Sequence, residues 1–427
     1  MKENRRDRID TSRFSEEELT ELRELAHRHN KRKRKAKKRA KRIRRFGIVF
    51  IAFAILYCVA VFSEIPVVAK WRAVYIQTAM TTQTHQWLAT AFIPRYIIDE
   101  VMDEYYAAMN AQRDLESDWG DGLEITNVPD GTLNEEEFYS LYWELNTDSV
   151  KNYLRSNPDL TEEGYQNILI EDLDNELGLT TANEDPVLVL DTANNLMIIG
   201  VSGDGYVGKM AIVKNTEQVE LCKAQNYGSH GDDVATFGEN NDALVAINAS
   251  RFVDLDGHGN GGTVKGSLVI DGTEYGSPER GYWRFAGLNQ ENELCISGYN
   301  DINISDYKWG VEVYPAIIVN GECVFDGSCM GIQPRAAIGQ TQTGDFMLLI
   351  VDGRQVGYSL GCSVAECANI LLEYNAYQAM NLDGGSSAVM WYNGEYITSS
   401  SSASGTGRYL PDAIVIKKAS DVEQTAY

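Results

Sequence analysis

Residues 379–390 read AMNLDGGSSAVM, so apolar residues flank one carboxylate, two glycines and two hydroxyl groups. We interpret this stretch as a buried strand that ends in a tight turn and presents Asp383 to a cleft. Glycine permits a close backbone approach and a positive φ angle, which a turn facing a ligand often needs. The alternative is an ordinary Gly-Gly turn in which the aspartate caps its own backbone.

Four other groups of polar and glycine residues lie where strands are expected to end. They read NASRF at 248–252, DLDGHGNGG at 254–262, PRAAIG at 334–339 and VDGR at 351–354. Arg408 is a further candidate, because it comes shortly before the last apolar run. Arginine forks bind phosphate oxygens in a bidentate manner, and paired carboxylates suit glycoside cleavage. A site for a sugar–phosphate bond would need both, although each arginine taken singly also fits an ordinary ion pair.

Taken together and in this order, the motifs resemble those of the phosphodiester glycosidase family. VDGR matches the family pattern unchanged, whereas NASRF, PRAAIG and NLDGGSS at 381–387 depart from it. The departures are Ala249 and Ser250 in place of glycines, Ala336 in place of threonine, and Ser386 in place of a third glycine. The resemblance covers residues 186–418.

The resemblance implies a hydrolase that cleaves a sugar-1-phosphodiester bond in a phosphate-linked glycan or exopolysaccharide. It implies catalytic roles for Asp383, Asp352 and Arg335, without deciding which carboxylate is the acid. The residues expected to bind the substrate are Asn248, Arg251, Arg354, Gly384, Gly385, Ser386, Ser387, Arg408 and Asn260. One alternative is a non-catalytic protein that binds surface glycans or assembles envelope polysaccharide, because a fold does not establish an activity. Another is a transferase that attaches a phospho-sugar.

The segment that begins at Asp254 partly fits a calcium loop. Asp254, Asp256 and Gly259 match loop positions 1, 3 and 6, but His258 and Lys265 stand at positions 5 and 12, where an oxygen ligand and a glutamate are needed. We therefore expect no certain cofactor, and calcium at Asp254 and Asp256 as the one candidate.

Seven cysteines are present and none forms a C-x-x-C pair, which argues against a zinc knuckle. If the body of the protein lies outside the cell, disulfides become feasible, and the closest pairs are Cys323 with Cys329 and Cys362 with Cys367.

Charge is distributed very unevenly along the chain of 427 residues. Residues 1–45 contain 19 Lys or Arg and 8 Asp or Glu, a net +11, so the rest carries −35 within the formal total of −24. The 18-residue run from Phe46 to Ser63 has no charge, and at ~1.5 Å per residue it spans roughly 27 Å, close to a bilayer core. The basic flank predicts a single span with the N-terminus in the cytoplasm and the acidic body outside the cell. A cleaved signal peptide and a nucleic-acid-binding tail are the alternatives, and the acidic body argues against nucleic acid as a partner.

The texture of the chain changes near residue 186 from helical segments to short strands and tight turns. Asp271-Gly272, Asn320-Gly321 and Asn393-Gly394 each lie between apolar runs and predict β-hairpins. Ser15, Asn134 and Ser363 each begin a capping-box pattern or a plausible helix start, and Thr161 is expected to cap another helix. We therefore predict an α+β fold around a mixed, largely antiparallel sheet.

The predicted segments are a basic cytoplasmic helical tail at 1–45, a transmembrane helix at 46–69, a juxtamembrane helix and acidic helical stalk at 70–185, a phosphodiester glycosidase-like domain at 186–418, and a C-terminal tail at 419–427. The aromatic residues Trp71, Tyr75, Trp87 and Phe92 in the third segment suit a position at the lipid interface.

Overall fold

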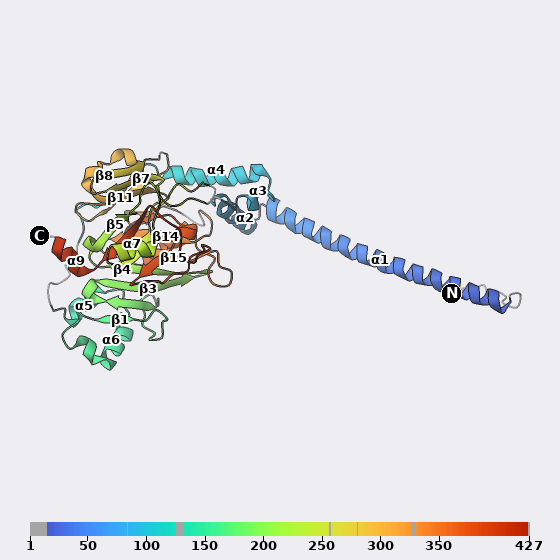
Figure 1. The fold of residues 1–427 in the computed structure, drawn as a ribbon, viewed down its shortest axis with the longest axis horizontal. Helices are drawn as coiled ribbons and strands as arrows, with labels where there is room; N and C mark the ends of the chain where they lie inside the picture. The colour runs from blue at the N-terminus through green and yellow to red at the C-terminus, as the bar shows by residue number, and fades with distance from the viewer. Residues whose placement is uncertain are drawn as a thin grey trace. The chain divides into compact units, whose positions relative to one another are not determined.

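The structure is a computed structural model, and it describes residues 15–82, 84–124, 132–255, 258–279, 281–325 and 330–425. The chain divides into two compact units, residues 1–72 and residues 73–427 (Figure 1). The helices are α1 (Glu16–Phe62), α2 (Pro66–Met80), α3 (Trp87–Thr90), α4 (Arg95–Ala111), α5 (Glu135–Leu141), α6 (Thr147–Ser156), α7 (Val234–Asn240), α8 (Val364–Glu373) and α9 (Ala419–Thr425).

The first unit consists mainly of α1, which is a single helix of 47 residues. The predicted capping box opens it: the Ser15 hydroxyl accepts a hydrogen bond from the Glu18 amide, and the Glu18 carboxylate accepts one from the Ser15 amide. The C-terminal part of α1 is long and apolar enough to cross a membrane, and its large apolar side chains are exposed. The basic tail and the apolar run therefore share one continuous helix.

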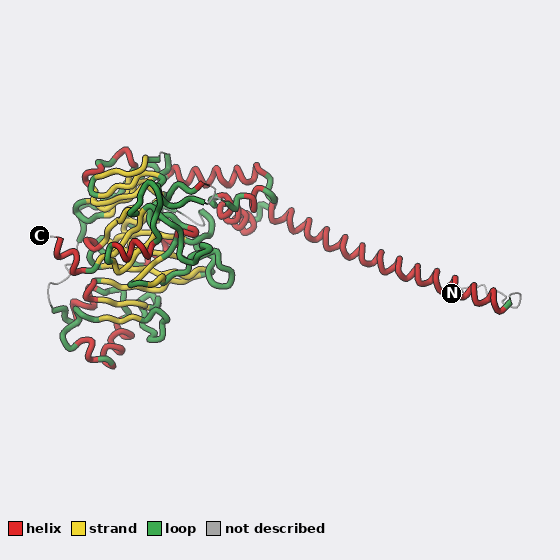
Figure 2. Tube along the Cα trace, viewed as in Figure 1, coloured by secondary structure: helices red, strands yellow, loops and turns green. Residues whose placement is uncertain are grey.

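The second unit is built on three sheets, which Figure 2 shows in yellow. The first has the strand order β1-β2-β3-β4-β15-β14-β16-β12-β13. Its strands are β1 (Leu169–Glu171), β2 (Val187–Asp191), β3 (Leu196–Gly203), β4 (Tyr206–Val213), β12 (Ala316–Val319), β13 (Glu322–Cys323), β14 (Arg335–Thr341), β15 (Phe346–Val351) and β16 (Ala376–Asn381).

The second and third sheets have five strands each, in the orders β10-β9-β11-β7-β8 and β18-β17-β6-β19-β5. Their strands are β5 (Val219–Lys223), β6 (Ala243–Asn248), β7 (Gly266–Ile270), β8 (Thr273–Ser277), β9 (Arg284–Asn289), β10 (Leu294–Ser297), β11 (Tyr307–Val313), β17 (Met390–Tyr392), β18 (Glu395–Tyr396) and β19 (Asp412–Lys417). Buried residues of all three sheets, such as Ile338, Ile247 and Trp309, belong to one hydrophobic core.

The α+β fold predicted from the sequence is confirmed, and every strand ladder between the described strands is antiparallel. The three predicted hairpins join β7 to β8, β12 to β13, and β17 to β18, with Asp271, Asn320 and Asn393 at positive φ. The predicted helix at Thr161 is wrong. A short 3-10 helix ends at Thr161, and the residues that follow form β1, because Leu169–Glu171 pair with β2.

The connection from β15 through α8 to β16 positions the candidate site. β15 and β16 both pair with β14, one on each side, and α8 packs against β14 and β16. The predicted capping box of Ser363 and Glu366 opens α8. As a result, the end of β16 and the adjacent Asp383 lie against the end of β6, where the first sheet meets the third.

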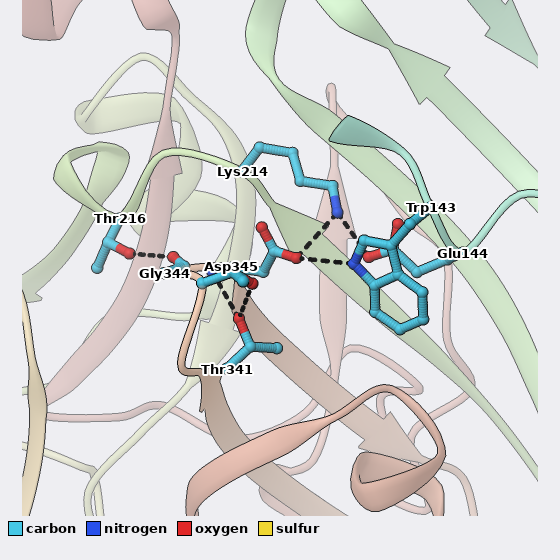
Figure 3. Close-up of polar contacts among 8 residues, drawn as sticks. Trp143, Glu144, Lys214, Thr216, Thr341, Gly344 and Asp345 are labelled. Carbon is cyan, nitrogen blue, oxygen red and sulfur yellow. Dashed lines mark hydrogen bonds and ion pairs between the residues drawn. The ribbon is translucent and has the colours of Figure 1, made fainter. Parts of the chain in front are cut away.

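A buried ion cluster joins residues 141–147 to the first sheet (Figure 3). The Lys214 ammonium lies 2.6 Å from a Glu144 carboxylate oxygen and 3.0 Å from an Asp345 carboxylate oxygen, and these side chains are 0%, 1% and 5% exposed. Burial raises the pKa of Glu144, and the Lys214 charge opposes that shift. The cluster and the β1–β2 ladder connect the predicted acidic stalk to the sheet domain.

Candidate active site

A cavity of about 490 Å³ opens in the second unit, within the ~300–1,000 Å³ range usual for small-molecule sites. Ten of the residues that the sequence predicted for the site line it: Arg251, Asp254, Arg335, Arg354, Asp383, Gly384, Gly385, Ser386, Ser387 and Arg408. Motifs separated by more than a hundred positions therefore meet in one place.

The turn after β16 is held from two sides. The Asn248 side-chain amide donates to the backbone carbonyl of Asp383 at 2.5 Å, and the Asp383 amide donates to the carbonyl of Ala249 at 3.0 Å. Any side chain at position 384 would approach the Pro334 carbonyl to 2.7 Å, and Gly385 has a φ of +66° with the Arg354 guanidinium against it. Both positions therefore require glycine.

Asp383 is only partly exposed, and both positive and negative side chains affect it. Burial raises the pKa of its carboxyl, and the Arg251 charge, a hydrogen bond from Ser387 and the Arg408 charge oppose this shift. The carboxyl therefore titrates above its ordinary range and is a stronger base than a free aspartate.

Arg251 and Arg408 are held in different ways. The Arg251 guanidinium donates to the Tyr314 hydroxyl and lies over the rings of Tyr314 and Trp283. Arg408 forms a bidentate ion pair with Asp254, with distances of 3.1 and 3.0 Å. Among the described residues, Arg408 is the only arginine of the cavity with a salt bridge.

Arg335 and Arg354 lie close enough to affect each other. Burial and the charge of Arg335 lower the pKa of Arg354. Arg335 is buried and donates to the backbone carbonyls of Cys362, Met330 and Gly331 at 3.1, 2.9 and 3.0 Å. It therefore shapes the wall of the cavity while leaving its charge without a carboxylate partner.

Four of the predicted site residues do not line the cavity. Asn248 is fully buried, and its side chain forms hydrogen bonds with the backbone of Asp383 and Val389. Asn260 is exposed; its side chain donates a hydrogen bond to the Ser229 carbonyl and accepts one from the Gly262 amide. Asp352 is buried behind the wall, and Asp256 lies outside the described residues.

Asp352 links two loops near the cavity. Its carboxylate accepts hydrogen bonds from the Tyr358 hydroxyl and the Ser399 amide, each at 2.9 Å. Burial raises its pKa to about 6. Residues 357–361 match the G-x-S-x-G pattern of a nucleophile elbow, but Ser359 is buried and its hydroxyl donates to the Asp352 carbonyl at 2.5 Å. In the structure Asp352 therefore holds Tyr358 and Ser399, and it does not line the cavity.

The structure adds a buried carboxylate that the sequence did not suggest. Asp412, the first residue of β19, accepts a 2.8 Å hydrogen bond from the Ser250 amide, and its other oxygen has no partner among the described residues. Burial, and then the nearby Asp383, raise the pKa of Asp412 to about 7. In the sequence, Asp412 is an acidic residue at the start of an apolar run, and this pattern alone does not indicate a site residue.

A second addition comes from residues that precede the sheet domain. Thr81, Thr82, Thr84 and His85 line the cavity, together with Tyr105 of α4. The Thr78 hydroxyl accepts a 3.0 Å hydrogen bond from the Ile332 amide, which fastens the end of α2 to the loop beside Arg335. A run of threonines has no motif signal, so the sequence alone did not indicate this wall.

Asp254, the first ligand in the calcium hypothesis, already has a partner in the structure. Asp254 is paired with Arg408 and also accepts a 2.5 Å hydrogen bond from the Gly259 amide. No group of three or more His, Cys, Asp or Glu side chains among the described residues has the arrangement of a metal site. Cys362 and Cys367 are free thiols with sulfurs 3.2 Å apart, and Cys329 lies outside the described residues.

The fold and the cavity define an α+β domain in which the Asp383 carboxylate meets several arginines. Residues 241–417 match the phosphodiester glycosidase family, which confirms the resemblance of the motifs for this part of the chain.

Two solved structures are similar to the chain at low identity. The zebrafish N-acetylglucosamine-1-phosphodiester alpha-N-acetylglucosaminidase catalytic domain, auto-inhibited by its propeptide, is 20% identical with a TM-score of 0.41, over 52% of this chain and 82% of that chain. A hypothetical protein from Synechocystis is 17% identical with a TM-score of 0.40, over 54% of this chain and 63% of that chain. No curated protein matches the chain.

Proposed function

We propose that the protein hydrolyses the bond between the anomeric carbon of a sugar and a phosphodiester in a phosphate-linked glycan or exopolysaccharide. The observation that carries this proposal is the meeting of Asp383 with Arg251, Arg335 and Arg354 in one cavity. The three arginines supply positive charge that no described carboxylate pairs with, which suits the oxygens of a phosphate. The family match supports the same class of reaction.

The chemistry assigns different tasks to the two kinds of charge. A water oxygen bonds to the anomeric carbon, the bond from that carbon to the phosphate oxygen breaks, and the phosphate leaves as a monoester. Because a phosphate monoester has a second pKa of only ~6, its departure needs arginine charge more than a strong acid. The proton of the attacking water passes to Asp383, whose raised pKa makes it an effective base.

The remaining wall suits a sugar. The cavity is lined by Ser386, Ser387, Ser401 and Ser402, and also by Tyr105. Hydroxyl groups bind sugar hydroxyls as donors and acceptors, and an aromatic face packs against the apolar side of a pyranose ring. These contacts orient the anomeric carbon toward Asp383.

A panel of methyl diesters of hexose-1-phosphates and N-acetylhexosamine-1-phosphates tests the proposal on the full chain in nanodiscs. We expect free sugar and methyl phosphate as products, and we expect Asp383→Asn to reduce kcat at least ~1,000-fold. Asp242→Asn is the control, because Asp242 forms an exposed ion pair with Lys418. Saccharide binding without turnover would instead assign the protein to surface glycan binding, and transfer of the phospho-sugar to an acceptor glycan would make it a transferase.

The location proposed for this activity is the outer face of a cell membrane. The apolar part of α1 would span the bilayer once, and the basic residues 31–45 would keep the N-terminus in the cytoplasm. Protease added to intact cells should then digest the sheet domain and spare a tag at the N-terminus. The reverse pattern would contradict this orientation.

A further inference from the structure

The wall of the cavity that precedes the sheet domain also carries an exposed aromatic surface. Tyr75, Trp87, Phe92 and Tyr96, which we call the aromatic rim, are 44%, 56%, 57% and 64% exposed. The Tyr75 hydroxyl donates to the Leu88 carbonyl at 2.8 Å, so the first two members of the rim are adjacent. Large exposed aromatic side chains in one short segment mark a surface that meets an apolar partner.

The charge of this segment distinguishes it from the rest of the chain. Residues 65–98 contain no Asp or Glu, whereas the chain as a whole has a formal charge of −24. The charged residues in that interval are Lys70, Arg72 and Arg95. Arg72 pairs with Glu64 at 3.3 Å and Arg95 lies 3.8 Å from Asp99, so the segment is close to neutral. An aromatic segment of this kind suits a lipid surface, because Trp and Tyr concentrate at the headgroup level and no excess of acidic charge repels anionic lipids.

The aromatic rim and the cavity wall are neighbours in the sequence. His85 lines the cavity and Trp87 belongs to the rim, so their Cα atoms lie within ~7 Å of each other. The segment also follows the candidate span, since α1 ends at Phe62. An aromatic rim at the headgroup level would therefore bring the cavity residues Thr84 and His85 to the membrane surface.

We infer that the aromatic rim lies in the lipid interface and that the cavity takes a sugar phosphodiester attached to a membrane lipid. This inference rests on the proposed hydrolysis and narrows its substrate class. The sugar and the phosphate enter the cavity, where Asp383 and the arginines act on them, and the lipid portion stays in the bilayer beside the rim. Hydrolysis releases a free sugar into solution and leaves a lipid phosphate monoester in the membrane.

The first test measures position rather than activity. The full chain is placed in nanodiscs that contain brominated phospholipid, which quenches nearby tryptophan fluorescence. Trp87→Phe should lower the intensity that bromolipid quenches, whereas Trp143→Phe should leave that quenched intensity unchanged, because the Trp143 indole donates to Asp345 of the buried ion cluster, away from the rim in the sequence. Unchanged quenching in Trp87→Phe would overturn the inference. A rim signal that depends on protein concentration and not on bromolipid would assign the rim to a second copy of the chain, which also overturns it.

The second test compares two substrates that share one sugar phosphate. One is the methyl diester cleaved best by the wild type, and the other carries a dialkylglycerol in place of the methyl group and is embedded in the nanodisc. Replacing Trp87 and Phe92 with serine should lower kcat/KM for the lipid substrate at least ~10-fold and change that for the methyl diester less than ~2-fold. Leu177→Ser, at an exposed site in the stalk, is the control. Equal losses on both substrates, or no loss on either, would overturn the inference, whereas no turnover of any methyl diester would overturn the proposed hydrolysis itself.

Discussion

The side-chain amide of Asn248 donates a 2.5 Å hydrogen bond to the backbone carbonyl of Asp383, 135 positions further along the chain. The same side chain accepts a hydrogen bond from the Val389 amide at 3.3 Å, so one buried residue spans the two ends of the turn that carries Asp383. Asn248 is the last residue of β6, and the contact therefore couples the third sheet to the end of β16.

Asn248→Ala should remove this coupling and leave the Val389 amide without its partner. We expect a loss of about 1–3 kcal/mol in the free energy of unfolding and at least a ~10-fold fall in kcat, because Asp383 would no longer be held in place. Urea denaturation and steady-state kinetics on the methyl diester measure the two effects. Asn195→Ala is the matched control, because Asn195 is also buried and donates to Gln218 at 2.9 Å. It should lower stability and leave kcat unchanged; equal effects of both variants on kcat would contradict a positioning role for Asn248.

The acid limb of the pH profile should report on Asp383. The proposed mechanism uses the ionised carboxylate, so kcat/KM should fall as the pH drops through a pKa above the ~3.9 of a free aspartate. The Arg251 charge lowers this pKa and the Asp254 charge raises it. Arg251→Gln should therefore move the limb to higher pH, and Asp254→Asn should move it to lower pH. A shift in the same direction for both variants would contradict Asp383 as the titrating group.

Asp352 should make the free energy of unfolding depend on pH. Burial raises its pKa to about 6 in the folded protein, so the folded state binds more protons than the unfolded state between about pH 4 and pH 6. The stabilisation from this group is complete below the unfolded pKa and is lost as the pH rises to about 6. The free energy of unfolding of the wild type relative to Asp352→Asn should therefore fall by on the order of 2 kcal/mol over this range and stay level above it. Urea titrations at intervals of pH measure the difference, and a rise with pH would contradict the raised pKa.

The Lys214 cluster should be a main contribution to holding residues 141–147 against the first sheet. Lys214→Met would leave two buried carboxylates facing each other, and we expect a loss of ~3–5 kcal/mol in the free energy of unfolding. Lys151→Met is the control, because Lys151 pairs with Glu135 at the surface and such pairs contribute ~0–1 kcal/mol. Urea denaturation measures both losses. Similar losses in the two variants would show that the buried cluster contributes no more to stability than a surface ion pair.

Local signals in the sequence were sufficient for much of the fold. Asp-Gly and Asn-Gly pairs predicted three hairpins because their residues tolerate the positive φ that such turns need, and the capping box at Ser363 placed the start of α8. Thr161 failed as a helix start, because the apolar residues after it pair with β2 instead of following a helical period. Pairing with a distant strand is a tertiary effect that the local pattern does not contain.

The candidate site was predictable in its motifs and unpredictable in its orientation. Asp383 and Arg354 line the cavity as expected, whereas Asp352, two residues before Arg354, faces the loop that carries Ser399. β15 ends at Val351 and Arg354 has a φ of +60°, so the chain turns between the two residues and their side chains diverge. A motif therefore indicates where the chain reaches the site and not which side chain enters it. The cavity residues Thr81, Thr82, Thr84 and His85 form no recognised sequence motif. Their place became visible only through the hydrogen bond between Thr78 of α2 and Ile332.

The pairing of β4 with β15 sets a practical limit on how the protein can be divided. The family match begins at residue 241, but β1 to β4 precede that point and cover one edge of β15. A fragment trimmed to the matched residues would expose the backbone amides and carbonyls of an apolar central strand, and such an edge recruits other chains into aggregates. Insolubility of that fragment would consequently say nothing against the activity, and shortened versions of the protein should keep everything from Ala73 onward.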